Sequence, residues 1–215
     1  MSYIEEMFSL KGRRIVVTGG AGAIPAEIAA GLAKAGADVC LWGRGTNHPM
    51  AKAAVEVRKA AGAGSGRIEA LTVETGDPAA CERAIAETER LIGAPDVLIN
   101  GVGGNSEKAA FVDLDEKRFR EIVELNLMAG LVIPTRAFAR YWMARGIKGN
   151  VLMMSSMASH KPLSGVWAYN AAKSAVLNLT GGLARELAPH GIRVNGIGPG
   201  FFIGNQNRSL LIDAK

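Results

Sequence analysis

The sequence predicts a three-layer α/β fold built around a doubly wound, parallel β-sheet. Short apolar runs rich in Val and Ile alternate with longer amphipathic or alanine-rich runs, at spacings that allow crossover connections. Many of the 27 glycines in the 215 residues lie at the ends of the apolar runs, where strands must turn into helices. Both observations favour parallel strands joined by helices.

The elements follow in order from these runs. Strands are expected at 13–19, 37–42, 67–73, 96–100, 150–155 and 192–197, because each run is short and bounded by glycine or polar residues. Helices are expected at 26–36, 51–61, 78–92, 115–145 and 166–189, and the fourth should be interrupted at Gly130 and Pro134. The sequence has no repeat and no low-complexity linker, so we expect residues 1–215 to form one domain.

The composition excludes several classes of protein. Hydrophobic residues make up 48% and charged residues 21% of the chain, as in a globular domain. The net charge is +5, but the basic residues are scattered, so we expect no nucleic-acid partner. Cys40 and Cys81 belong to no C-x-x-C pair, which argues against a metal site and favours a reducing, cytoplasmic location. The sequence shows no signal-peptide pattern and no apolar run of ~18 residues, so we expect no membrane span.

A glycine-rich turn follows the first predicted strand. It contains Thr18, Gly19, Gly20 and Gly22 and leads into the first helix. Glycines at this position let the backbone approach a pyrophosphate, which then lies at the helix N-terminus. An isolated turn of this kind is often only a turn, but after the first strand of an alternating chain it predicts a Rossmann-type dinucleotide site.

Arg44 lies at the end of the second predicted strand. Dinucleotide folds often carry an acid here that binds the ribose 2′-OH of NAD, whereas an arginine nearby accommodates the 2′-phosphate of NADP. This chain has Gly43 and Arg44, so we expect NADP as cofactor, with NAD as the alternative. The competing interpretation of Arg44 is a solvated surface side chain.

Ser156, Tyr169 and Lys173 form the candidate catalytic group. Ser156 follows a predicted strand, and Tyr169 and Lys173 lie four residues apart in the next helix, so both can face the same space. The carboxyl edge of a parallel sheet can bring these side chains together. A phenol beside an ammonium suits proton transfer to or from an oxygen, because the cation stabilises the phenolate.

With these motifs in order, the chain resembles the short-chain dehydrogenase/reductase family. The resemblance runs from the glycine turn at 18–25, through the family's N-N-A-G segment at 100–103, to its P-G pair at Pro199-Gly200. The family's helix asparagine matches Asn126, and its catalytic serine, tyrosine and lysine match Ser156, Tyr169 and Lys173. The resemblance therefore implies an enzyme that transfers a hydride between a nicotinamide and a secondary alcohol or ketone.

The resemblance also implies a role for each residue. Tyr169 is then the general acid/base, Ser156 binds the same substrate oxygen, and Lys173 stabilises the phenolate and binds the nicotinamide ribose. Asn126 would hold a water that links Lys173 to solvent; by itself it could equally pair with neighbouring backbone. The implied cofactor-binding residues are Thr18, Gly19, Gly20, Gly22, Ile24, Arg44, Glu74, Asn100, Gly101, Gly103, Tyr169, Lys173, Pro199, Gly200 and Phe202.

The chain departs from the family pattern at several positions. Ala23 and Pro25 replace two glycines of the turn, Glu74 replaces an aspartate near the adenine, and Gly204 replaces a threonine. Pro25 is tolerable in a first helical turn, where the backbone N–H is often unpaired. Family members also continue well past Phe201, so the resemblance implies a chain truncated at its C-terminus, with the seventh strand missing.

The expected substrate is a sugar acid such as mannonate/fructuronate or gluconate. Two loops resemble those of the D-mannonate oxidoreductase (fructuronate reductase) and gluconate dehydrogenase-like branch, and their amides suit a polyhydroxylated molecule. The same amides could instead cap turns. The candidate substrate residues are Asn105, Lys108, Met157, His160, Asn205 and Arg208.

Two other functions stay open at this point. The chain could reduce 3-oxoacyl groups or other small ketones, or it could be a non-catalytic homologue that still binds the cofactor. The altered glycine turn favours the second alternative, and the intact catalytic group argues against it. The resemblance further implies a homo-oligomer, a tetramer or dimer, formed through the two longest helices.

Overall fold

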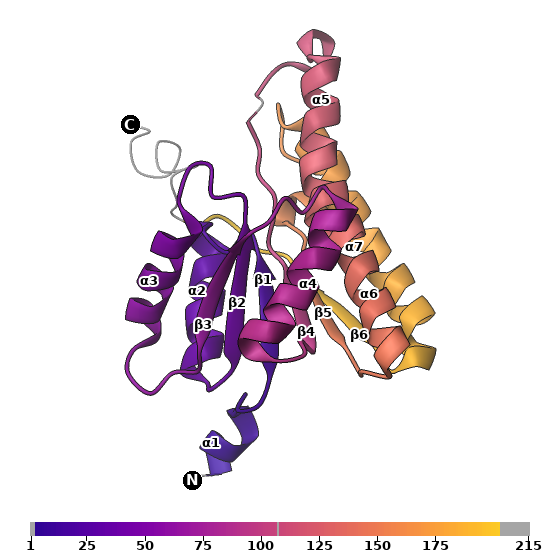
Figure 1. The fold of residues 1–215 in the computed structure, drawn as a ribbon. Helices are drawn as coiled ribbons and strands as arrows, with labels where there is room; N and C mark the ends of the chain where they lie inside the picture. The colour runs from indigo at the N-terminus through magenta and orange to yellow at the C-terminus, as the bar shows by residue number, and fades with distance from the viewer. Residues whose placement is uncertain (1–2, 107, 203–215) are drawn as a thin grey trace.

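The computed structural model describes residues 3–106 and 108–202 and has the predicted three-layer α/β architecture (Figure 1). Its parallel sheet has the strand order β3-β2-β1-β4-β5-β6. The order reverses between β1 and β4, so the carboxyl ends of these strands border the crevice where such sheets bind ligands. The strands are β1 (Arg14–Thr18), β2 (Asp38–Gly43), β3 (Ile68–Thr72), β4 (Val97–Asn100), β5 (Asn150–Met154) and β6 (Arg193–Ile197).

Helices cover both faces of the sheet. The α-helices are α1 (Tyr3–Phe8), α2 (Ala23–Lys34), α3 (Met50–Ala61), α4 (Pro78–Ile92), α5 (Glu116–Val123), α6 (Ile133–Arg145) and α7 (Trp167–Leu187). The shorter or irregular turns are η1 (Phe111–Asp113), η2 (Glu124–Val132), η3 (Met157–Ser159) and η4 (Ala188–His190). The sequence did not predict α1 or the one-turn helices, because so few residues carry no readable periodicity.

Alternation along the strands explains the two layers of core. Val16 of β1 packs in the cluster that includes α4, α6 and α7, whereas Ile15 and Val17 pack in the cluster formed with α2 and α3. Successive strand side chains point to opposite faces, so a strand covered on both faces must be apolar throughout. This is why β1 reads as a continuous apolar run.

The predicted start of one helix and the two predicted interruptions of another were wrong. Helix α2 begins at Ala23, with Gly22 as its N-cap, three residues before the predicted start. The predicted interruptions at Gly130 and Pro134 are not breaks, because α5, the π-helical η2 and α6 follow one another without a gap. Pro134 is the second residue of α6 and lies directly after the π-helical η2, so the helix continues through a residue that has no N–H to donate. A Cβ at Gly130 would lie 2.7 Å from the Val102 carbonyl oxygen, so this glycine serves a close approach.

The helical run Glu116–Arg145 is long and apolar enough, by length and composition, to cross a membrane. However, 61% of its apolar window is buried inside the protein, where Leu131, Phe138 and Trp142 pack against the sheet. Core packing therefore explains its apolar character.

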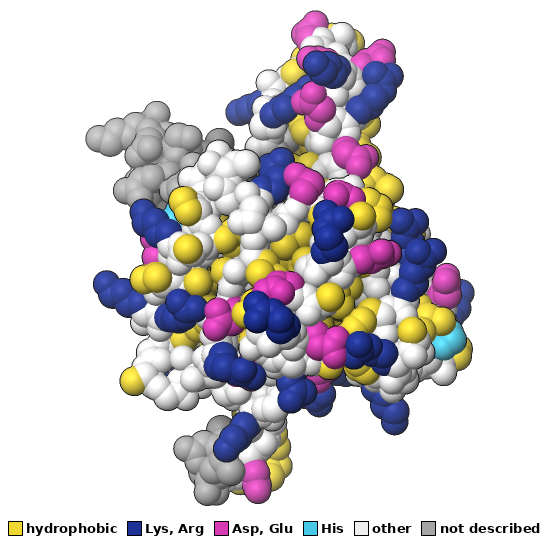
Figure 2. All heavy atoms as spheres, in the orientation of Figure 1, with side chains coloured by type: hydrophobic (Ala, Val, Ile, Leu, Met, Phe, Trp, Pro, Cys, Tyr) yellow, Lys and Arg dark blue, Asp and Glu magenta, His cyan; other side chains and the backbone are white. Residues whose placement is uncertain are grey.

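On the face shown in Figure 2, Lys and Arg side chains are interspersed with Asp and Glu.

Candidate active site

The glycine turn between β1 and α2 forms a cradle that fits a pyrophosphate. Gly19 has a φ of +65°, and a Cβ on it would lie 2.8 Å from the Gly101 carbonyl oxygen. A Cβ on Gly20 would lie 2.8 Å from the Leu41 Cβ. At Gly22 no described side chain caps α2, so the first N–H groups of the helix are available to an anion. Gly19 and Gly20 therefore serve close packing within the protein, and Gly22 leaves the start of α2 exposed, where a dinucleotide phosphate would lie.

The replacements at Ala23 and Pro25 leave this cradle open. Ala23 is exposed at the first position of α2. Pro25 is buried and packs over Gly101, since a Cβ on Gly101 would lie 2.7 Å from the Pro25 Cγ. The proline therefore fills space over Gly101 that a side chain there would need.

Thr18 and Asn100 support the cradle from within. Thr18 is fully buried; its hydroxyl accepts a hydrogen bond from Gly101 N at 3.0 Å and joins the ends of β1 and β4. Asn100 is 2% exposed, and its Nδ2 donates to Thr135 Oγ1 at 2.8 Å. Its Oδ1 has no partner among the described residues. Both side chains point into the protein, so they can act on a cofactor only through the backbone they hold.

Arg44 and Glu74, both predicted to bind cofactor, face each other. Their closest atoms, Arg44 Nε and Glu74 Oε2, are 4.0 Å apart, and both side chains are more than half exposed. Glu74 also accepts a hydrogen bond from Gly76 N at 3.2 Å. An exposed pair at this distance holds its partners weakly. Arg44 can therefore turn to a phosphate, with Glu74 as its competitor.

Ser156 is placed just after β5, and the start of α7 places Tyr169 and Lys173. Ser156 is 7% exposed and caps η3, since its Oγ accepts a hydrogen bond from Ala158 N at 3.1 Å. The Lys173 Nζ lies 5.7 Å from the centre of the Tyr169 ring, as the spacing of four predicts. The Nζ also donates to the Met154 carbonyl oxygen at 2.9 Å, which draws α7 onto the end of β5.

Lys173 is the buried cation of this site. It is 4% exposed, and burial lowers the pKa of its ammonium from 10.5 to about 8. Gly103 makes room for it, because a Cβ at this position would lie 3.0 Å from the Nζ. A buried ammonium with one carbonyl partner has remaining donors for ribose hydroxyls.

Asn126 holds the loop that follows β4. It is 1% exposed; its Nδ2 donates to Gly104 O at 2.7 Å and to Ile122 O at 2.9 Å. Its Oδ1 accepts from Gly104 N at 3.0 Å. The side chain therefore pairs with backbone, which was the alternative interpretation on sequence alone.

The candidate substrate residues are only partly brought together. Met157 is half-buried in η3 and its N–H donates to Pro199 O at 3.0 Å, so it lies beside the predicted P-G pair. His160 and Lys108 are exposed, and Asn105 is half-buried. Asn205 and Arg208 lie outside the described residues.

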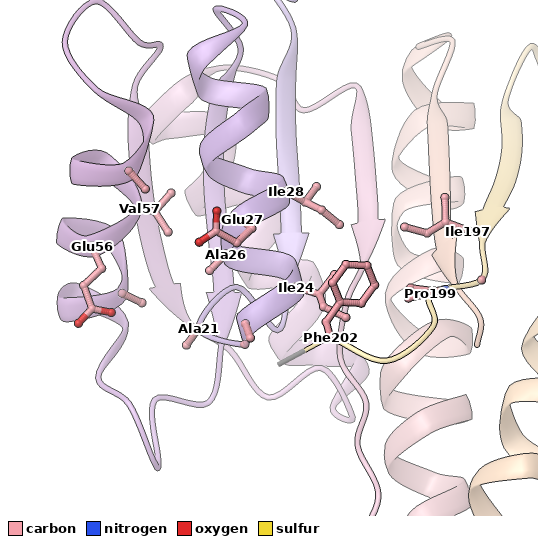
Figure 3. Close-up of a pocket in the computed structure, with 15 residues that line it drawn as sticks. Ala21, Ile24, Ala26, Glu27, Ile28, Glu56, Val57, Ile197, Pro199 and Phe202 are labelled. Atoms are coloured by element: carbon pink, nitrogen blue, oxygen red, sulfur yellow. The ribbon is translucent and has the colours of Figure 1, made fainter. Parts of the chain in front are cut away.

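A cavity of about 830 Å³ adjoins the cradle on the outer side of α2 (Figure 3). Its walls come from the start of α2, from α3 and from the segment after β6. The predicted catalytic residues Ser156, Tyr169 and Lys173 do not line it. It meets the predicted cofactor site at Gly22, Ile24, Pro199 and Phe202.

Comparison with known proteins identifies the family. The model of the short chain dehydrogenase family matches residues 13–212. The chain belongs to this family. As a short-chain dehydrogenase it is an oxidoreductase of CH–OH groups whose cofactor is a nicotinamide dinucleotide.

Three relatives of the chain carry names of sugar-acid dehydrogenases or oxidoreductases. Gluconate 5-dehydrogenase of Gluconobacter oxydans is 31% identical over 98% of this chain and 79% of its own. A Haemophilus influenza protein assigned as a D-mannonate oxidoreductase, solved with NAD, is 29% identical with a TM-score of 0.85, covering 98% and 79%. A Beutenbergia cavernae protein assigned as an NAD(P)-dependent gluconate 5-dehydrogenase, solved with NADP, is 34% identical with a TM-score of 0.82, covering 96% and 79%.

Sequence reasoning missed several residues that hold this dehydrogenase site together. Gly104 is the backbone partner of Asn126. Ser159 donates to the Lys173 carbonyl oxygen at 2.8 Å and bonds Ser155 Oγ at the same distance. Asn170 binds the loop before α7. Of these residues, only Asn170 could have been found from the sequence, because an asparagine near a helix start often binds the backbone of the preceding loop.

Proposed function

We propose that this short-chain dehydrogenase transfers a hydride between NADP(H) and a secondary alcohol or ketone of a sugar acid. The observation that carries the proposal is the position of Lys173 in α7, whose Nζ binds Met154 O at the end of β5 and lies against Gly103 in the loop after β4. Gly101, at the start of that loop, borders Gly19 of the β1–α2 cradle. The gluconate and mannonate names of its relatives support the choice of substrate class.

The residues of the chain would divide the work as follows. When bound, the dinucleotide supplies or accepts the hydride. Tyr169 would move the proton to or from the substrate oxygen, and the Ser156 hydroxyl would hold that oxygen. Lys173, whose Nζ keeps donors beyond its bond to Met154, would bind the ribose and stabilise the phenolate.

Three finer points belong to the same proposal. Arg44 would select NADP through the 2′-phosphate. The substrate carboxylate would pair with a cation near the loop after β4, for which Lys108 is the described candidate. The enzyme would act in the cytoplasm as a homo-oligomer.

A cofactor-linked absorbance screen tests the proposal. The panel contains hexonates and ketohexonates on one side and 3-oxoacyl esters and small ketones on the other, each with NADPH or NADP. We expect turnover on the sugar acids, and we expect Tyr169→Phe to lower it roughly 10²–10⁴-fold while cofactor binding is kept. Near-normal turnover by Tyr169→Phe would remove the assigned role. Turnover on 3-oxoacyl esters alone would show that these esters, and not sugar acids, are the substrate class. Tight NADPH binding without any turnover would favour the non-catalytic alternative.

A further inference from the structure

Asn170 follows Tyr169 at the start of α7, but its side chain does different work. It is 7% exposed, and both polar atoms of its amide bind the backbone of Leu163. Its Nδ2 donates to Leu163 O at 2.8 Å, and Leu163 N donates to its Oδ1 at 3.2 Å. The amide therefore pairs with residue 163 as a neighbouring strand would, with one donor and one acceptor.

Leu163 lies in the segment that separates Ser156 from Tyr169. After η3 this segment has no helix or strand until α7 begins at Trp167, and it contains Gly165 with a φ of +81°. A backbone of this kind needs side chains or other loops to bind its polar groups. Asn170 supplies that partner near the middle of the segment.

A second contact holds the same segment from its other end. Ala109, in the loop after β4, donates from its N–H to Gly165 O at 3.1 Å and accepts from Trp167 Nε1 at 3.0 Å. The Phe111 and Trp167 rings meet edge to face with centroids 5.6 Å apart. The loops after β4 and β5 are thus joined, and Asn170 ties that pair of loops to α7.

We propose that Asn170 is a positioning residue of the active site. By holding Leu163 it sets the path of the chain between Ser156 and Tyr169, so that both hydroxyls can reach one substrate oxygen. This inference rests on the proposed function. Loss of the two Asn170–Leu163 hydrogen bonds, which we call the clasp, should affect turnover rather than cofactor binding, because the clasp does not involve the β1–α2 cradle. A displacement of about 1 Å at reacting groups can cost roughly 10²-fold in rate.

Asn170→Leu removes both hydrogen bonds and keeps a side chain that branches at the same carbon, although leucine is larger. Asn178→Leu makes the same change at an exposed position two turns along α7 and serves as the matched control. We expect kcat on the substrate found in the screen to fall roughly 10- to 100-fold in Asn170→Leu. The Kd for NADPH should not change, and Asn178→Leu should keep the kcat of the unmodified enzyme.

Asn170→Asp separates positioning from loss of stability. A protonated carboxyl still offers one donor and one acceptor to Leu163, whereas the carboxylate offers only acceptors and faces the Leu163 carbonyl. The ratio of kcat in Asn170→Asp to kcat in the unmodified enzyme should therefore rise as pH falls. The same ratio for Asn170→Leu should stay flat with pH.

Hydrogen exchange of residues 160–166 reads the clasp without any substrate. The Leu163 amide should exchange faster in Asn170→Leu than in Asn178→Leu, and equal exchange in both would overturn the proposal. Faster exchange with unchanged kcat would also overturn it, because the segment would then move without effect on the reaction. If the unmodified protein turns over nothing in the screen, the proposed function fails, and the exchange result still decides whether Asn170 holds the segment.

Discussion

Lys173 shows how a single residue couples the site to stability. Its pKa falls to about 8 because the folded protein buries the ammonium, whereas the unfolded chain keeps a value near 10.5. Between these two values the unfolded state binds more protons, so the stability of the fold rises with pH across this window. The protein accepts a buried charge at neutral pH in order to place it beside Tyr169.

We predict that Lys173→Met removes this pH dependence. As pH rises from 8 to 10.5, the free energy of unfolding of the unmodified protein should increase by up to about 3 kcal/mol relative to that of the variant. Urea unfolding without cofactor measures the difference at several pH values. Lys161→Met, at an exposed position, is the control and should show no such gain. A constant difference between Lys173→Met and the unmodified protein would contradict the assigned burial of the charge.

Arg44 and Glu74 are the residues that we expect to decide the preference between NADPH and NADH. We predict that NADPH binds roughly tenfold or more tightly than NADH, and that Arg44→Ala removes most of this difference. Glu74→Gln should strengthen NADPH binding, because it removes the carboxylate that competes for the guanidinium. Fluorescence titration with both cofactors checks this, with the exposed Arg120→Ala as a charge-matched control. Equal affinities of the unmodified protein for NADPH and NADH would contradict the assignment of Arg44 to the 2′-phosphate.

At the scale of elements, the junction of β1, α2 and β4 depends on two coupled positions. Pro25 fills the space over Gly101, and a Cβ at 101 would also lie 2.5 Å from the Thr18 carbonyl oxygen. A side chain at position 101 would therefore meet both the Pro25 ring and the Thr18 backbone. We expect the proline to add to a restriction that the backbone already imposes.

A double-mutant cycle tests this coupling. Gly101→Ala should destabilise the protein by about 1–3 kcal/mol through overpacking. In the Pro25→Gly background the same change should cost less, although contact with the Thr18 carbonyl remains. Chemical denaturation gives the free energies, and NADPH binding reports on the cradle. Additive effects of the two substitutions would show that the positions are independent.

Two helical segments show how far sequence patterns predict the bounds of an element. The predicted bounds of helix 78–92 are confirmed, because Asp77 as N-cap and a proline in the first turn mark its start. The run 115–145 carried Gly130 and Pro134, which predicted breaks. The structure absorbs them in a π-helical segment and a new first turn, since packing against the sheet outweighs local preference.

At the scale of the molecule, Arg67 joins three elements at the edge of the sheet opposite the site. Its guanidinium binds Asp38 Oδ2 at 2.7 Å and the Ile92 carbonyl oxygen at the end of α4 at 3.2 Å. Burial raises the pKa of Asp38, but hydrogen bonds from the Arg67 side chain and backbone outweigh burial and lower it overall. The resulting stability is present above the unfolded pKa near 3.8 and is lost as pH falls through the folded value.

Acid unfolding should therefore depend on Asp38. We predict that Asp38→Asn lowers the free energy of unfolding by roughly 1–2 kcal/mol at neutral pH, and that this deficit shrinks as pH falls below 4. Urea unfolding over this pH range measures it. Asp113→Asn, at an exposed position, should change little at any pH. A deficit that stays constant down to pH 3 would show that charge plays no part.

The sequence by itself determined the sheet, its helices and the family, because alternating runs, the glycine turn and the Ser–Tyr–Lys spacing are local patterns. Lys173 could be placed one turn after Tyr169 from spacing alone. Only the tertiary structure decided that this ammonium is buried, that Arg44 faces Glu74, and that Pro25 packs over Gly101. It also decided that Asn126 and Asn170 bind loop backbone. These properties depend on which segments distant in sequence meet, and burial and hydrogen-bond partners are set by that meeting rather than by neighbours along the chain.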